Sequence, residues 1–226
     1  RLELSSGLAV GGLTPSLALF RAVRGLVPDK PIYVLLRPRP GGFAYSALEF
    51  AVMADDARAF LGEGADGLVF AALTDKGDIH RDNCATLVGL ADRADKGAVF
   101  HRAFDFLSDS FGSLDDLIEL GFERVLTSGG HTTAEAGTTH LAALVQHAGW
   151  QIGVLPAGRI RAENVADLVR ATRCDQVHAA PRAPGTDLTL GARPLLAPGM
   201  GDGSELDDDA VRRLRARLDE LVGALA

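Results

Sequence analysis

Short apolar runs rich in β-branched residues alternate with longer amphipathic patterns along the whole chain. The short runs predict seven strands, at residues 1–5, 31–38, 67–73, 98–104, 124–129, 151–158 and 176–181. The longer patterns predict helices at residues 16–27, 47–64, 81–94, 113–121, 139–149, 162–172 and 205–226. Because each strand is followed by a helix, the strands are expected to run parallel.

Two architectures are built from repeated strand–helix units: the closed eight-stranded barrel and the open doubly wound sheet. The open sheet usually carries a G-x-G-x-x-G loop after its first strand, and the nearest candidate here, "SGLAVGGLTPS", lacks that spacing. We therefore predict an α/β fold of the TIM-type (β/α)8 barrel, with residues 1–226 forming one domain. Since seven strands are visible and the chain begins on one of them, we expect the first strand and helix of the barrel to be missing from this chain.

Composition narrows the classes of partner. The chain has 226 residues and a formal net charge of −7, with no block rich in Lys and Arg, so nucleic acid and anionic membranes are not expected partners. No apolar run is long enough to span a bilayer, and the first residues do not resemble a signal peptide, which predicts a cytoplasmic protein. The two cysteines, Cys84 and Cys174, are far apart and are expected to be buried and reduced.

Polar residues interrupt the apolar strands near their carboxyl ends. Barrel strands place alternate side chains toward the helices and toward the interior. If the apolar residues face the helices, six polar residues converge inside the carboxyl mouth of the barrel: Glu3, Arg37, Arg39, His101, Asp105 and His178. Arg102 has the opposite parity but follows its strand closely enough to reach the mouth. Barrel enzymes place their active sites at this end.

This set predicts a site for a small anion. Arginines and glycine-rich turns suit carboxylate and phosphate groups, and we assign the binding role to Arg37, Arg39, Arg102, Ser128, Gly129 and Gly158. The groups that can transfer protons are His101, Asp105, Glu3 and His178. The alternative remains open that these residues form purely structural buried ion pairs.

Several motifs together resemble the CutC family, named for copper homeostasis. They are "RLELSSGLAVGGLTPSLA", "RPRPGGFAYSALEF", "FHRAFD", "RVLTSGG" and "AGRIRAEN" followed by "VH". The resemblance implies a cytoplasmic barrel protein, commonly a homo-oligomer, that is associated with copper tolerance and copper(I) binding, with no established enzymatic activity. Where relatives usually read "ELC", this chain has Glu3-Leu4-Ser5. A serine oxygen is a poor ligand for soft copper(I), so a copper site at this position is expected to be weakened.

Two hypotheses of different class follow. In the first, the protein binds or traffics copper(I), as the resemblance implies. In the second, it is a barrel enzyme that acts on a small phosphorylated or carboxylated metabolite at the mouth. The residues predict no other cofactor and do not identify a reaction.

Overall fold

A parallel six-stranded sheet forms the centre of the computed structural model, which describes residues 1–185 and 204–225. Its strands follow one another in chain order: β1 (Leu2–Leu4), β2 (Ile32–Leu35), β3 (Gly67–Phe70), β4 (Gly97–Phe100), β5 (Arg124–Thr127) and β6 (Gly153–Pro156). The sheet curves as an incomplete TIM-type barrel, which confirms the predicted fold class. Among the described residues, β1 pairs only with β2, so the sheet is open at its β1 edge.

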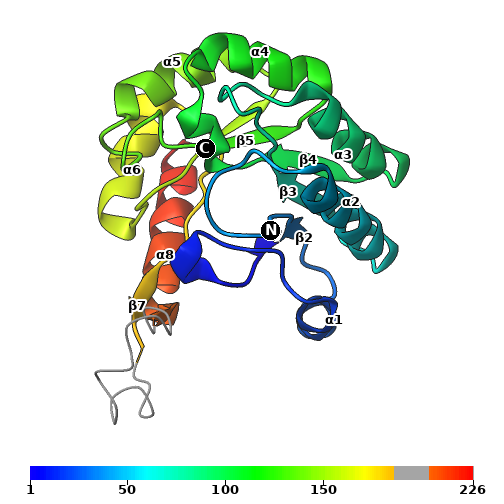
Figure 1. Ribbon diagram of the computed structural model, residues 1–226. Coiled ribbons are helices and arrows are strands. Elements are labelled where there is room, and N and C mark those ends of the chain that lie inside the picture. Colours follow the sequence, from blue (N-terminus) through cyan, green and yellow to red (C-terminus); the bar gives the residue numbers. More distant parts are fainter. Residues whose placement is uncertain (186–203, 226) are drawn as a thin grey trace, which may run out of the picture.

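Helices cover the outer side of this curved sheet (Figure 1). They are α1 (Leu17–Leu26), α2 (Ala47–Gly62), α3 (Arg81–Arg93), α4 (Ser110–Leu120), α5 (Thr138–Ala148), α6 (Ala162–Thr172) and α8 (Asp208–Leu225), with the short 3₁₀ helices η1 (Leu8–Val10) and η2 (Arg102–Phe106) in loops. The last helix, α8, packs against α6. No helix in the part of the chain that the structure describes is long and apolar enough to cross a membrane.

The predicted strand at 176–181 is wrong in extent. Only His178 pairs with the sheet, through a parallel bridge to Ala157 in which its N–H donates to the carbonyl of Pro156 at 2.9 Å. The next residues turn away from the sheet. The Pro- and Gly-rich composition of residues 180–207 predicts one extended loop, whereas Arg182–Pro184 (β7) within it pairs antiparallel with Ser204–Leu206 (β8). The predicted strand ends in Ala179, Ala180 and Pro181. The alanines have little side chain to bury and the proline has no backbone N–H to donate, which explains why pairing with the sheet stops after His178. Residues 186–203 of that loop lie outside the described residues.

The barrel interior and the outer core are made by alternate residues of the same strands. The interior is filled by a ring of seven residues: Tyr33, Leu35, Val69, Val99, Leu126, Leu155 and Ala157. Residues of the other parity, such as Val34, Phe70 and Phe100, pack under the helices. Hydrophobic residues therefore fill both sides of the strands, and the same alternation puts Glu3, Arg37 and His101 on the interior side.

Tyr33 occupies the amino-terminal layer of the interior because the residues in register with it on β3 and β4 are glycines. Tyr33 pairs with Gly67, which pairs with Gly97. A Cβ atom on Gly67 would lie 2.1 Å from Cε1 of Tyr33, and one on Gly97 would lie 2.6 Å from the Tyr33 hydroxyl. The two glycines therefore leave the space that the phenol ring fills.

Substituting Gly67→Ala is expected to lower the free energy of unfolding by about 1–3 kcal/mol, because the methyl group must displace a packed ring. The matched control is Gly62→Ala at the end of α2, where a Cβ atom meets nothing within 4 Å. That variant is expected to change stability by less than about 1 kcal/mol and in the stabilising direction. Urea denaturation measures both, and equal effects of the two substitutions would contradict the packing argument.

Candidate functional site at the barrel mouth

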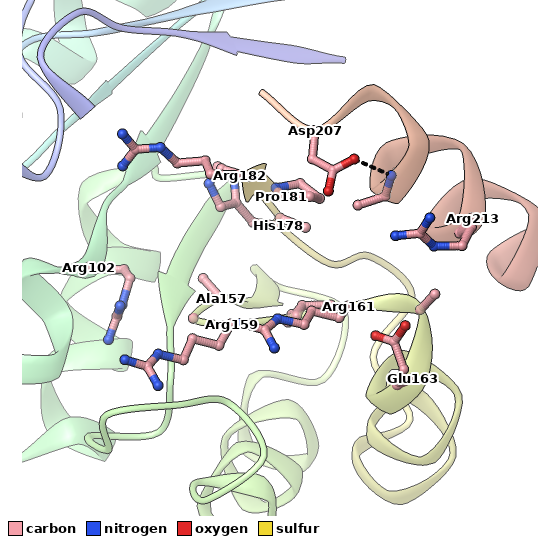
Figure 2. A pocket seen from close by; sticks show the side chains of 16 residues that line it. Arg102, Ala157, Arg159, Arg161, Glu163, His178, Pro181, Arg182, Asp207 and Arg213 are labelled. Carbon is pink, nitrogen blue, oxygen red and sulfur yellow. Dashed lines mark hydrogen bonds between the residues drawn. The ribbon is translucent and has the colours of Figure 1, made fainter. Parts of the chain in front are cut away.

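A cavity of about 610 Å³ opens at the carboxyl end of β6, between the bridge at His178 and the first turns of α6 and α8 (Figure 2). Three of the predicted site residues line it: Arg102, Gly158 and His178. Asp105 and Ser128 lie behind Arg102 and hold it, while Glu3 contacts His178. Arg37, Arg39 and His101 do not line this cavity. The structure therefore brings about half of the predicted set together and separates the remainder.

Asp105 is the most heavily hydrogen-bonded acid near the mouth, and its side chain is only 7% exposed. Its Oδ1 accepts from the Thr127 hydroxyl at 2.6 Å, from the Ser128 N–H at 2.9 Å and from the Gly130 N–H at 3.2 Å. Its Oδ2 accepts from Arg102 Nε at 2.8 Å and from the Ser128 hydroxyl at 3.0 Å. With both oxygens occupied, Asp105 is suited to position its neighbours rather than to take a proton from a ligand.

The turn that supplies these donors needs a glycine. Gly129 has φ 70° and its N–H donates to the Thr127 hydroxyl at 2.9 Å. A Cβ atom there would lie 2.7 Å from the carbonyl of Gly137. Gly129 thus shapes the turn that holds Asp105 and does not line the cavity itself.

Arg102 is held so that one edge of its guanidinium remains for the cavity. Nε is bound to Asp105, and Nη2 donates to Ser128 Oγ at 2.8 Å. Nη1 points at Gly158, where a Cβ atom would lie only 3.4 Å from it. Gly158 has φ 108°, a conformation that side chains other than hydrogen rarely adopt. The missing side chain leaves this nitrogen open to the cavity.

Sequence reasoning missed most of the cations in this cavity. Besides Arg102, the lining contains Arg159, Arg161, Arg182 and Arg213, against the two acids Glu163 and Asp207. Figure 2 shows Arg102, at the start of η2, and Arg159, in the loop after β6, extending toward one another. The motif "AGRIRAEN" carried the signal for Arg159 and Arg161, whereas Arg213 comes from α8 and no local pattern points to it.

The acids do not balance these cations. Asp207 Oδ1 accepts from the N–H of Ala210 at 2.8 Å and so caps the start of α8. Within residues 1–185 and 204–225, Arg159, Arg161 and Arg213 are not within 4.0 Å of a carboxylate. The amino terminus of α6 adds its positive helix end to the same wall. The cavity therefore has an excess of positive charge.

Glu3 and His178 form the pair that could exchange a proton with a ligand here. Nδ1 of His178 lies 3.7 Å from Glu3 Oε2, and the side chains are 30% and 23% exposed. Because Nδ1 faces the carboxylate, Nε2 is the ring nitrogen left for the cavity that His178 lines. A carboxylate beside an imidazole orients the ring.

Arg39 is bound to its own loop. Its guanidinium pairs with Glu49 and donates to the carbonyls of Gly42 at 3.0 Å and Ala44 at 2.7 Å. The pairing holds the pKa of Glu49 at about 2, first through the Arg39 hydrogen bond and then through the Ser46 N–H. We therefore assign Arg39 a structural role in shaping the loop between β2 and α2.

His101 is buried and uncharged. It is 8% exposed, and its Nδ1 accepts from the N–H of Ala103 at 3.1 Å, which places the ring proton on Nε2. Burial, followed by the nearby charge of Arg37, lowers the pKa of His101 to about 3. The ring is therefore a hydrogen-bond donor at neutral pH and a weak base.

This burial predicts a pH dependence of stability. An unfolded histidine titrates near 6.5, so as the pH falls below that value the unfolded state binds a proton that the folded state excludes. The free energy of unfolding should fall toward acid by up to about 1.4 kcal/mol per pH unit from this residue, and should not depend on it above about pH 7. Urea denaturation of wild type and His101→Gln at pH 6 and 4 measures the difference; identical pH slopes would contradict a buried neutral His101.

The residues present do not fit a copper(I) site. No group of three or more His, Cys, Asp or Glu side chains within residues 1–185 and 204–225 is arranged to hold a metal ion. Cys84 is buried in α3, where burial raises its pKa to about 12, and Cys174 lies beside the amino ends of β5 and β6. Neither thiol lines the cavity that contains Arg102, Arg159, Arg161 and Arg213 (the arginine cavity), so the two thiols do not supply a copper(I) site there.

Comparisons with known proteins agree on one family. The sequence model of the CutC family matches residues 1–183. The CutC family protein of Treponema denticola is 43% identical over 178 residues, which cover 79% of this chain and 71% of that protein. The copper homeostasis protein cutC homolog of Mus musculus is 40% identical over 183 residues, which cover 81% of this chain and 66% of that protein.

A solved structure extends the agreement to the fold. The structure of the CutC protein of Streptococcus agalactiae superposes with a TM-score of 0.75 at 33% identity, over 79% of this chain and 87% of that one. The motifs that carried the resemblance lie around the barrel mouth described above. The chain therefore belongs to the CutC family.

Proposed function

We propose that this protein binds a small phosphorylated metabolite in the arginine cavity at the carboxyl mouth of its barrel. The observation that carries the proposal is Arg102, which Asp105 and Ser128 hold so that Nη1 faces the cavity beside Gly158. Arg159, Arg161 and Arg213 add positive charge without carboxylate partners among the described residues. A phosphate group carries up to two negative charges and accepts many hydrogen bonds, so it suits this wall better than a single carboxylate.

The position of the cavity supports the same ligand class. Barrel enzymes frequently bind phosphate at the loops after their last two strands, next to a helix amino terminus. Among the described residues, β6 and the bridge at His178 are the last parallel segments, and the start of α6 lines the cavity. The Glu3–His178 pair supplies acid–base capacity at the same cavity, so the enzyme hypothesis is that His178 transfers a proton to or from the bound phosphoester.

Titration with inorganic phosphate tests the proposal. Calorimetry should detect saturable binding, and phosphate should raise the melting temperature. Arg159→Ala is expected to weaken phosphate binding by about tenfold, the effect of one charged hydrogen bond. Arg58→Ala on α2 is the matched control, since it removes the same charge from an exposed pair with Asp55. Absence of saturable binding, or equal weakening by both substitutions, would refute a phosphate site in this cavity.

Copper handling is a second candidate because relatives of this chain are named for copper homeostasis. We propose to test it with the reduced protein and a chromogenic copper(I) chelator. Stoichiometric copper(I) retained against the chelator would support this function, and none retained would exclude it. Ser5→Cys is the informative variant: a thiolate at the mouth should increase copper(I) retention if the position forms part of a site.

We also propose that the protein is a cytoplasmic homo-oligomer. Light scattering at several protein concentrations measures the subunit number, and fractionation of cells measures the location. A concentration-independent monomer, or recovery outside the cytoplasm, would contradict these two expectations.

A further inference from the structure

Three hydrogen-bond donors are buried without a partner on the side of the mouth formed by β2 and β4. They are Nε of Arg37, the hydroxyl of Tyr45 and Nε2 of His101. Arg37 is 7% exposed and His101 is 8% exposed, so both side chains are more than nine-tenths buried. A buried donor that has lost its water and gained no partner is unfavourable, which makes three in one place unusual.

Two of the donors flank the ring of Phe43, and the third lies beside Arg37. The centroid of Phe43 lies 5.3 Å from Cζ of Arg37 and 5.0 Å from the centroid of His101. The Tyr45 hydroxyl lies within reach of the Arg37 guanidinium, but the two groups are not aligned for a regular hydrogen bond. If the register of β2, β3 and β4 continues by two residues, Ala71 lies between Arg37 and His101 with only a methyl group.

The charge of Arg37 is also incompletely matched. Its Nη1 donates to the carbonyls of Val10 at 2.8 Å and Gly12 at 2.9 Å, and its Nη2 donates to the carbonyl of Gly41 at 2.8 Å. No carboxylate in the described part of the chain forms an ion pair with it. Carbonyl dipoles thus hold the guanidinium in place, while the positive charge itself has no counter-ion.

We infer that Arg37, Tyr45 and His101 form a second binding subsite that receives the carboxylate of a ligand. All three offer donors, because the His101 proton is on Nε2, and a carboxylate supplies acceptor lone pairs together with the missing negative charge. The low pKa of His101 agrees with this role, since a neutral ring donates from Nε2 without competing for a ligand proton. Entry requires the half-buried Phe43 ring to move aside.

This subsite is separate from the arginine cavity. None of its three residues lines that cavity. His101 and Arg102 are adjacent in the chain, but His101 belongs to the proposed carboxylate subsite and Arg102 to the arginine cavity. Binding of a carboxylate here therefore does not depend on the proposed phosphate site. If both sites are present, they select a metabolite with a phosphate at one end and a carboxylate at the other.

Formate, the smallest carboxylate, is the probe. In the ¹⁵N-labelled full chain, the imidazole Nε2–H resonance of His101 should shift with a saturable dependence on formate at constant ionic strength. Tyr45→Phe removes one donor without changing the shape of the ring, and should weaken formate binding by about tenfold or more. It should change the stability of the free protein little, because that hydroxyl has no well-aligned partner to lose.

Two comparisons keep the subsites distinguishable. Arg159→Ala should leave the formate response unchanged while weakening phosphate binding, and phosphate should leave the His101 signal in place. The carboxylate subsite is refuted if formate produces no saturable shift, if Tyr45→Phe responds as wild type does, or if crystals soaked in formate show only water at these donors. Failure of phosphate binding alone would refute the arginine-cavity proposal and leave this one standing.

Discussion

Asp105→Ala is expected to lower the free energy of unfolding by about 3–5 kcal/mol, the usual cost of removing one partner from a buried charged network. The carboxylate is 7% exposed and accepts from the side chains of Thr127, Ser128 and Arg102 as well as from backbone N–H groups. Removing it leaves these donors facing each other and the Arg102 charge without its partner. Urea denaturation measures the loss.

Asp167→Ala is the control for this prediction. Asp167 lies on α6 with its side chain 88% exposed and pairs only with Arg170 three residues later. Its removal should change stability by less than about 0.5 kcal/mol. Asp105→Asn keeps the size of the side chain, and its loss of stability should lie between those of Asp105→Ala and Asp167→Ala. The loss arises because the amide NH2 group of Asn faces N–H and O–H donors whose hydrogen bonds the carboxylate accepted. Equal stability of the Asp105→Ala and Asp167→Ala proteins would mean that the network is not structural.

Arg102→Ala is expected to reduce affinity for inorganic phosphate by about 30- to 100-fold, because it removes the cation that is fixed in the cavity before the ligand arrives. Arg102→Lys retains the charge but cannot reproduce the hydrogen bonds to Asp105 and Ser128 together, so it should recover only part of the loss. Calorimetry with each variant measures the affinity.

Stability and binding must be separated for these variants. Arg102→Ala and Arg102→Lys each lose the hydrogen bond from Arg102 Nε to Asp105. Melting curves without phosphate therefore establish whether each variant is folded at the temperature of the titration. Raising the ionic strength should weaken phosphate binding in wild type more than in Arg102→Ala. If Arg102→Ala binds phosphate as tightly as Arg58→Ala, the cavity does not use Arg102.

The regular part of the fold could be predicted from local pattern. The alternation of apolar strands and amphipathic helices depends on residues a few positions apart, and it located all six sheet strands and the helices around them. The alternation within each strand also placed Glu3, Arg37 and His101 on the interior side. The segment at 176–181 was overpredicted because its pattern says nothing about the backbone turning away after His178.

The division of the polar residues could not be predicted this way. Arg37, Arg39 and Arg102 look alike in sequence, yet one is held by loop carbonyls, one by Glu49 and one by Asp105 at the edge of a cavity. Some of their partners are close in the chain, such as Asp105 three residues after Arg102. Others are 10 to 29 positions away, and only the folded chain brings them into contact. Asp105 likewise became a positioning residue through the turn at residues 128–130.

Periodicity and motifs in this chain were thus sufficient to identify the barrel, the inward face of each strand and the CutC family, since these follow from short-range spacing of side chains. The packed fold was needed to show that Arg159 and Arg213 join Arg102 in one cavity, and that donors of Arg37, Tyr45 and His101 lie together without an acceptor. Whether a charge or a hydrogen-bond donor has a partner depends on contacts between residues that are far apart in the sequence. Those contacts are fixed only by the tertiary structure.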